Sequence, residues 1–143
     1  MRVPYLQQGP LNPELSKVYP GTKALLKPLI TVVLRYQDKK QKLFTLVDSG
    51  ADVCLFPKDV ADILGIDIKN GAMVFITGIG GGQIPFYFHE VEILLGEYQV
   101  KTKVGFSNSH IGVSGILGQQ GFFDNFIVSF DYRNRFIEIT KHS

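Results

Sequence analysis

The stretch 43–52 is the part of this sequence that most constrains how the chain can fold. An apolar, β-prone run at 43–47 leads directly into Asp48, so a strand delivers one carboxylate to the point where it leaves the core. Residues 49–51 then supply a hydroxyl group, a permissive backbone at Gly50 and little bulk. Another chain segment can approach this carboxylate closely, as a catalytic aspartate requires, although an Asp-Ser-Gly turn taken alone is more often structural.

Short β-prone runs recur along the rest of the chain, separated by turn residues. Their number and spacing predict an all-β fold, either a closed barrel or a sandwich, with one or two short helices. The runs cover 29–36, 43–47, 53–56, 73–76, 84–88, 91–95, 98–104, 116–118, 126–130 and 135–140.

A helix is predicted over 58–64, because Pro57 is suited to open it and Gly65 to end it. Its apolar positions Val60, Ile63 and Leu64 share one face. A second, single-turn helix is expected near 119–125.

Glycine occupies four of the five positions 78–82, between two β-prone runs. These glycines predict a mobile hairpin tip, and Ile79 is the one apolar side chain that it carries. The segment is not a dinucleotide-binding fingerprint, because Gln83 replaces the final glycine and no helix follows. A loose hairpin loop without a function is the alternative.

The composition divides the chain at residue 28 and predicts a single domain over 29–143 with one core. Residues 1–28 hold five of the seven prolines, so they predict an N-terminal arm without a long helix or a central strand. The arm could pack on the body, reach a partner subunit or be trimmed, and the sequence does not choose among these.

The charges and the single cysteine narrow the classes of partner. A net charge of +2, spread along the chain, does not predict nucleic-acid binding. Cys54 has no second cysteine to pair with, which fits a reducing compartment, and we expect core packing for it. No apolar run approaches the roughly 20 residues that cross a bilayer, and no signal pattern opens the chain, so a cytoplasmic protein without membrane contact is expected.

Three segments together resemble the retropepsin-like aspartic proteases, the family of retroviral and retrotransposon proteases and their cellular and bacterial relatives. They are Val47-Asp48-Ser49-Gly50-Ala51-Asp52, Gly78-Ile79-Gly80-Gly81 and Ile116-Leu117-Gly118, in the family's order and at similar spacing. The resemblance covers roughly residues 29–126, and it implies the barrel with a flap hairpin and a homodimer.

The resemblance also implies a role for each matching position. Asp48 looks like the catalytic aspartate, Ser49 like the hydroxyl that braces the loop against its twin, and Gly50 like the residue whose backbone meets carboxylate and substrate. The positions that it implies for substrate binding are Ala51, Asp52, Leu55, Ile76, Gly78, Ile79, Gly80 and Ile116.

Peptide hydrolysis without a metal needs one group that takes a proton from water and one that donates to the carbonyl oxygen. Two carboxylates about 3 Å apart do both, because they share a proton. This sequence has one such loop, so two chains must pair through Asp48 across a two-fold axis. We therefore predict a homodimeric endopeptidase that acts on extended polypeptides and needs no metal or organic cofactor.

One position departs from the family's pattern. Many viral members have arginine where this chain has Gln119, and that arginine pairs with the residue equivalent to Asp52. A neutral amide can still donate a hydrogen bond, but it gives no ion pair. The alternative functions are therefore a catalytically weak or inactive dimerisation or peptide-binding module and, with less support, a monomeric barrel that binds small ligands.

Overall fold

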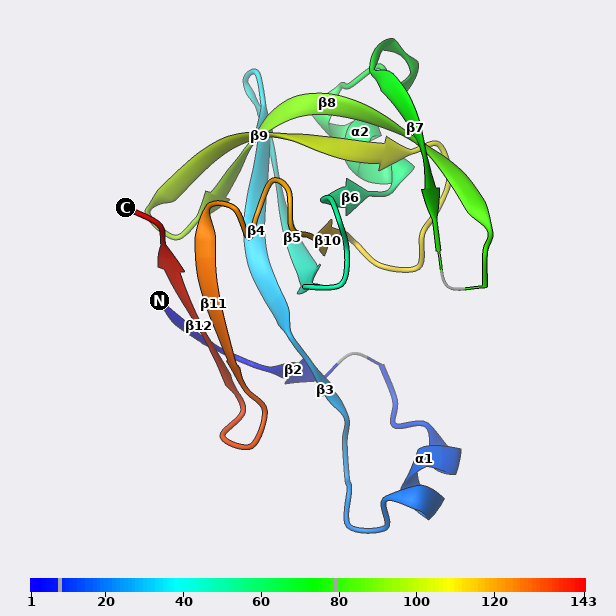
Figure 1. Cartoon of the computed structure of the whole chain (residues 1–143), viewed down its shortest axis with the longest axis vertical. Coiled ribbons are helices and arrows are strands. Elements are labelled where there is room, and N and C mark those ends of the chain that lie inside the picture. Colours follow the sequence, from blue (N-terminus) through cyan, green and yellow to red (C-terminus); the bar gives the residue numbers. More distant parts are fainter. Residues whose placement is uncertain (8, 79) are drawn as a thin grey trace.

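A computed structural model describes residues 1–7, 9–78 and 80–143 of the chain. Its strands form a strongly curved main sheet, a smaller sheet at the termini and a two-stranded sheet within the N-terminal arm (Figure 1). The elements are β1 (Arg2–Pro4), β2 (Leu6–Gln7), α1 (Pro13–Val18), β3 (Leu26–Lys27), β4 (Leu29–Tyr36), β5 (Lys39–Val47), β6 (Leu55–Phe56), α2 (Lys58–Leu64), the 3-10 helix η1 (Ile68–Asn70), β7 (Ala72–Thr77), β8 (Gln83–Leu95), β9 (Tyr98–Ser107), β10 (Ile116–Leu117), β11 (Phe126–Asp131) and β12 (Phe136–Lys141).

The main sheet has the strand order β4-β5-β10-β6-β9-β8-β7, and β4 also pairs with β8. This extra pairing joins Leu34 to Ile93 and closes the sheet on itself, because β8 bends round to reach the first strand. Both side chains are fully buried. The all-β architecture expected from the sequence is confirmed.

β8 joins two runs, 84–88 and 91–95, that the sequence predicts as separate strands. The polar residues between them do not interrupt the ladder, since His89 pairs with Val104 and Glu90 with Lys103. No glycine or proline stands at the join, so the backbone hydrogen bonds continue through it.

Helix α2 begins and ends where the sequence predicts, and Gly65 ends it in a left-handed conformation with φ 72°. The face that Val60, Ile63 and Leu64 share is only partly buried. Val60, Ala61 and Leu64 are buried, whereas Ile63 is 53% exposed. The buried side of the helix is centred on Val60 and Leu64 and includes Ala61 instead of Ile63. The spacing of apolar residues alone does not show which of the two neighbouring positions packs against the sheet.

The predicted single-turn helix near 119–125 is instead a series of turns. Gly121 has φ 102°, which excludes a continuous helix at its centre. Hydrogen bonds from Phe123 N–H to Gly118 and from Asp124 N–H to Gln119 span five residues rather than four. The short helices of the described chain are therefore α1 and α2, and α1 lies within the N-terminal arm.

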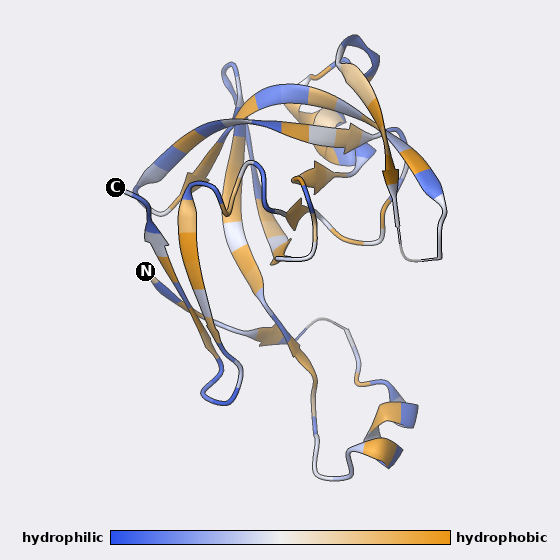
Figure 2. Cartoon of the chain, viewed as in Figure 1, coloured by the Kyte–Doolittle hydropathy of each residue, from blue (hydrophilic) through white to orange (hydrophobic). Residues whose placement is uncertain are grey.

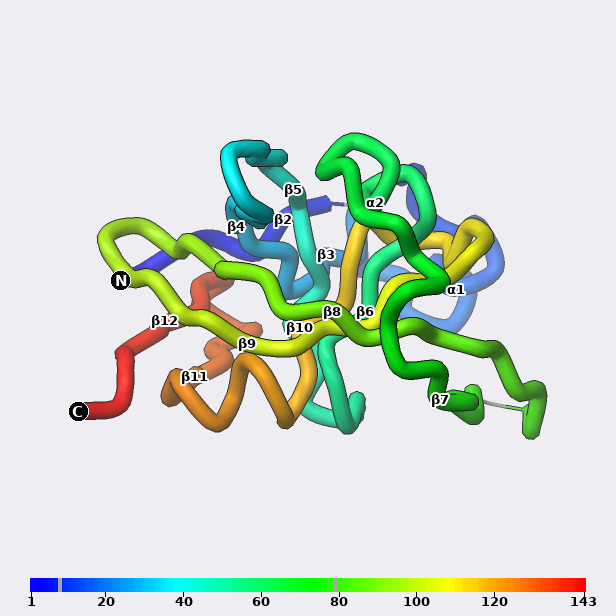
Figure 3. Tube along the Cα trace, turned by 90° about the horizontal axis from the view of Figure 1, so that it is seen from above, coloured from blue at the N-terminus to red at the C-terminus, as the bar shows by residue number. Residues whose placement is uncertain are grey.

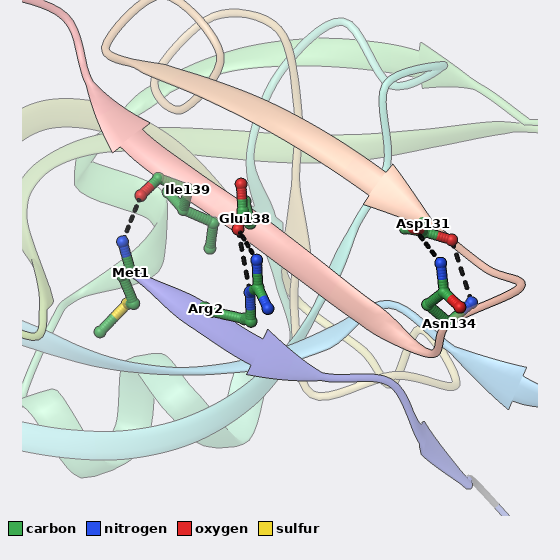
Figure 4. Close-up of polar contacts among 6 residues, drawn as sticks. All are labelled: Met1, Arg2, Asp131, Asn134, Glu138 and Ile139. Carbon is green, nitrogen blue, oxygen red and sulfur yellow. Dashed lines mark hydrogen bonds and ion pairs between the residues drawn. The ribbon is translucent and has the colours of Figure 1, made fainter.

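The first five residues pack on the body of the same chain. β1 pairs antiparallel with β12, and β12 pairs with β11. Figure 4 shows the terminal ammonium of Met1 donating to the Ile139 carbonyl and the side chain of Arg2 donating to Glu138. The exposed Arg2–Glu138 ion pair adds little stability by itself, so the strand pairing is the main attachment.

The middle of the arm projects away from the body as a loop that carries α1 (Figure 1). The amide oxygen of Asn12 accepts from the Glu14 N–H and Pro13 opens the helix, which explains why six residues are helical here. No residue of α1 is buried. The division into an arm at 1–28 and a domain at 29–143 stays a prediction.

Hydrophobic residues fill the space enclosed by the curved sheet. Figure 2 colours β4, β6, β10 and β11 as largely hydrophobic and the turn between β11 and β12 as hydrophilic. Buried Thr45 satisfies its hydroxyl group by donating to the Ile30 carbonyl at 3.1 Å. In the described part of the chain, no helix is long and apolar enough to cross a membrane.

Candidate active site

Asp48 directly follows β5, whose end lies next to the two short strands β10 and β6 in the main sheet. β10 lies between β5 and β6, parallel to β5 and antiparallel to β6. The register sets Leu117 beside Val47, and the Asp48 N–H then donates to the Leu117 carbonyl at 3.0 Å. The backbone of Asp48 is therefore fixed by a segment almost 70 residues further along the chain.

The turn after β5 orients the carboxylate of Asp48. The N–H of Gly50 donates to its Oδ1 atom at 2.9 Å, and the N–H of Ala51 donates to its backbone carbonyl at 3.1 Å. Asp48 is half-buried, while Ser49 and Gly50 are exposed. One side of the carboxylate is thus held by the protein, and the turn beside it is open to a substrate or a second chain.

A second turn, just after β10, supports the first. The backbone N–H of Gln119 donates to the Ala51 carbonyl and that of Gln120 to the Asp52 carbonyl, both at 2.8 Å. Gly118 is required between them, because a Cβ atom there would collide with the backbone carbonyl of Val53. The two turns form one hydrogen-bonded unit.

The side chain of Gln119 also binds this unit. Its Nε2 atom donates to the Ser49 carbonyl at 2.6 Å. The carboxylate of Asp52 is exposed, and within the described residues it has no ion pair or side-chain hydrogen bond. Gln119 therefore braces the turn that carries Asp48, and the Asp52 carboxylate faces solvent.

Cys54 is buried at the base of the two turns. Its sulfur accepts a hydrogen bond from the Gly118 N–H at 3.3 Å and lies 3.6 Å from the Gln120 carbonyl oxygen. Burial raises the pKa of this thiol to about 12, so it stays neutral and unreactive. The position fits the core role expected from the sequence.

The predicted flap is the hairpin of β7 and β8. Thr77 pairs with Gln83 at its end, and the N–H of Gly78 donates to the Gly82 carbonyl at 3.0 Å. Gly80 has φ 93°, a conformation that favours glycine. Ile79, the expected side chain at the tip, lies outside the described residues. Seen from above in Figure 3, the end of the hairpin and the turn after β5 reach toward the same side of the molecule.

Three of the positions predicted to bind substrate, Leu55, Ile76 and Ile116, lie on two separate parts of the fold. Leu55 in β6 pairs directly with Ile116 in β10, so these two side chains lie together beside the Asp48 turn. Leu55 is buried and Ile116 is half-buried. Ile76 is half-buried in the flap strand β7, where it pairs with Ile84.

The comparisons with known proteins were made for the sequence and for the structure. No protein-family model and no curated protein matches the sequence. Solved structures do match. EIAV protease in complex with the inhibitor HBY-793 has a TM-score of 0.51 and 24% sequence identity, covering 65% of this chain and 82% of that chain. A retropepsin-like aspartic protease from Rickettsia conorii has a TM-score of 0.60 and 14% identity, covering 98% of each chain. The fold is retropepsin-like.

The resemblance noted in the sequence is confirmed at the level of the fold. The match to the Rickettsia protein extends over almost the whole chain, whereas the viral protease matches about two thirds of it. At these identities the likeness shows the fold. The roles proposed for Asp48 and its neighbours rest on the geometry of the two hydrogen-bonded turns.

Sequence reasoning missed several backbone and side-chain contacts that hold this candidate site. The Leu117 carbonyl, the Gln119 amide and the Cys54 sulfur all support the Asp48 turn. Each contact joins segments more than 60 residues apart, and no local motif marks such a pair. Across the described residues, no group of three or more His, Cys, Asp or Glu side chains could hold a metal ion.

Proposed function

We propose that this protein is an aspartic endopeptidase that works as a homodimer, with one Asp48 from each subunit. One observation carries the proposal. The carboxylate of Asp48 is held by the Gly50 N–H on an exposed turn of a retropepsin-like fold, where a second copy can reach it. A single chain supplies one such turn, so the catalytic pair needs two chains.

The two carboxylates share one proton, because both cannot ionise about 3 Å apart. The ionised Asp48 takes a proton from water as the water oxygen bonds to the carbonyl carbon, and its neutral twin donates a proton to the carbonyl oxygen. The resulting diol collapses when the C–N bond breaks. The leaving nitrogen receives a proton from one carboxyl group, and a diol hydroxyl returns a proton to the other.

The neighbouring residues bind the polypeptide in the proposed enzyme. Leu55 and Ile116 offer an apolar wall beside Asp48, and the exposed Asp52 carboxylate accepts hydrogen bonds from substrate N–H groups. The flap hairpin, with Ile76, Gly78 and its glycine-rich end, closes over the substrate and shields it from water.

The test compares wild type with Asp48→Asn on an unstructured protein substrate at acidic and neutral pH. We expect cleavage by the wild type, with an acidic optimum, and no cleavage by the variant. Circular dichroism serves as the control for folding, and sedimentation should show a dimer for both proteins. Equal cleavage by both proteins would contradict the proposal.

A second candidate is a dimeric peptide-binding module without effective catalysis. The observation that favours it is the neutral Gln119, which binds Ser49 of its own chain and leaves Asp52 without a cationic partner. This module would sediment as a dimer and bind extended peptides with no cleavage by the wild type. A monomer in sedimentation would argue against both candidates.

A further inference from the structure

An apolar pocket lies beside the strand that carries Asp48. Its volume is about 450 Å³. Part of its wall comes from the N-terminal arm and part from β4, β5 and the loop that precedes β10. The lining residues are Leu6, Gln7, Gly9, Leu29, Phe44 and Ser114, and none of these six is charged.

The pocket opens on the face of β5 that leads to Asp48. Burial alternates along this strand, with Thr45 and Val47 buried and Phe44 55% exposed. Alternate side chains of a strand share a face, so Phe44 and Leu46 point to the same side of β5. Asp48 is the next alternate residue, just beyond the end of the strand. The large apolar side chain of Phe44 is thus displayed on the same face as the catalytic carboxylate.

Backbone hydrogen bonds connect two other lining residues, Leu29 and Ser114, to segments of the candidate site. Leu29 is the ladder partner of Leu46, and the Leu46 N–H donates to the Gly115 carbonyl at 2.9 Å. Ser114 immediately precedes that glycine, and Ile116, the expected substrate contact, follows it. Backbone pairing therefore connects the walls of the pocket to the segment that carries Ile116.

We propose that this pocket binds a large apolar side chain of the substrate polypeptide, about four residues from the scissile bond. This inference rests on the proposed function. Phe44 precedes Asp48 by four residues, which corresponds to ~13 Å along a strand, and an extended peptide covers that distance in about four residues. The uncharged walls and the volume suit leucine or phenylalanine better than a charged side chain. Through Leu6, the arm becomes part of substrate selection.

The first experiment measures cleavage of a peptide library that varies the third, fourth and fifth residues on each side of the scissile bond. We expect wild type to prefer leucine or phenylalanine at one of these positions, with about a tenfold gain in kcat/KM over serine. Phe44→Gln should lose this preference and keep the others. Ile63→Gln, an equally exposed apolar residue on α2, is the matched control and should retain it. Unchanged selectivity in Phe44→Gln would overturn the proposal.

The second experiment separates this inference from the proposed function. Calorimetry with the full-length Asp48→Asn protein compares a peptide that has leucine at the selected position with one that has serine there. If wild type cleaves nothing, the peptides are taken from a binding screen instead, and the enzyme proposal fails without affecting this measurement. We expect the leucine peptide to bind about tenfold more tightly, and Asp48→Asn/Phe44→Gln to lose that ratio. An equal ratio in the two proteins refutes the pocket assignment.

Discussion

The side-chain amide of Gln119 donates a 2.6 Å hydrogen bond to the backbone carbonyl of Ser49. These two residues are 70 positions apart, and their contact closes the unit of two turns that holds Asp48. An arginine at this position would be expected to pair with Asp52, but the neutral amide binds the turn of its own chain. The support of the Asp48 turn is therefore built into the chain itself.

Gln119→Ala should weaken the support of this turn. Loss of one exposed hydrogen bond costs about 0.5–1.5 kcal/mol of unfolding free energy, and the less constrained Asp48 should reduce kcat more than it changes KM. Urea unfolding and steady-state kinetics measure the two effects. Gln120→Ala is the control, because its side chain forms no hydrogen bond to the described residues. Equal kinetics for both variants would show that the Gln119 amide has no positioning role.

Gly118→Ala should destabilise the protein by about 1–3 kcal/mol. The new Cβ atom would collide with the Val53 carbonyl and lie 2.7 Å from the Ala51 carbonyl oxygen, so the two turns must separate. Gly21→Ala is the control, since a Cβ atom there meets nothing within 4 Å. Thermal unfolding of both variants decides the matter, and a wild-type melting temperature for Gly118→Ala would disprove this packing.

Because of Cys54, the free energy of unfolding should fall as the pH rises in the alkaline range. Burial raises the pKa of its thiol from 9.0 to about 12, so the unfolded chain releases this proton first. The contribution is fully present below about pH 9 and is lost as the pH rises toward 12, by at most about 1.4 kcal/mol per pH unit. The stability difference between wild type and Cys54→Ala should therefore shrink between about pH 8 and pH 10. A constant difference would mean that the thiol titrates normally.

The two leucine-sized side chains of α2 should respond differently to truncation. Leu64→Ala should cost about 2–5 kcal/mol, because Leu64 is 1% exposed and its removal leaves a cavity. Ile63→Ala should change stability by less than about 0.5 kcal/mol, since that side chain is 53% exposed. Denaturant titrations compare the two directly. Comparable losses would place Ile63 in the core.

Self-processing, if the protein is an active protease, should occur in the projecting part of the arm. Val18 and Tyr19 are 67% and 58% exposed, and no residue of α1 is buried, whereas β1 is protected by pairing with β12. Mass spectrometry after long incubation should find cleavage between residues 9 and 25 in wild type and an intact chain in Asp48→Asn. Identical intact masses would exclude self-processing under those conditions.

Much of the fold could be predicted from the sequence because the relevant signals are local. The β-branched run of β4 and the span of α2 with Gly65 at its end were both located to the residue. The extent of β8 was missed, because the polar pair His89 and Glu90 looks like a break although backbone pairing with β9 continues across it. The turns at 119–125 were taken for a helix, since the backbone conformation of Gly121 is not encoded in residue type.

The sequence by itself determined that a strand would carry Asp48 into a small-residue turn, because alternating burial and glycine tolerance act over a few neighbouring residues. Only the tertiary structure decided that β10 enters between β5 and β6, that Gln119 binds Ser49 instead of Asp52, and that Phe44 faces an apolar pocket on the side of the candidate site. These contacts join segments far apart in the chain. Their partners are selected by how the closed sheet packs as a whole, so no short stretch of sequence specifies them.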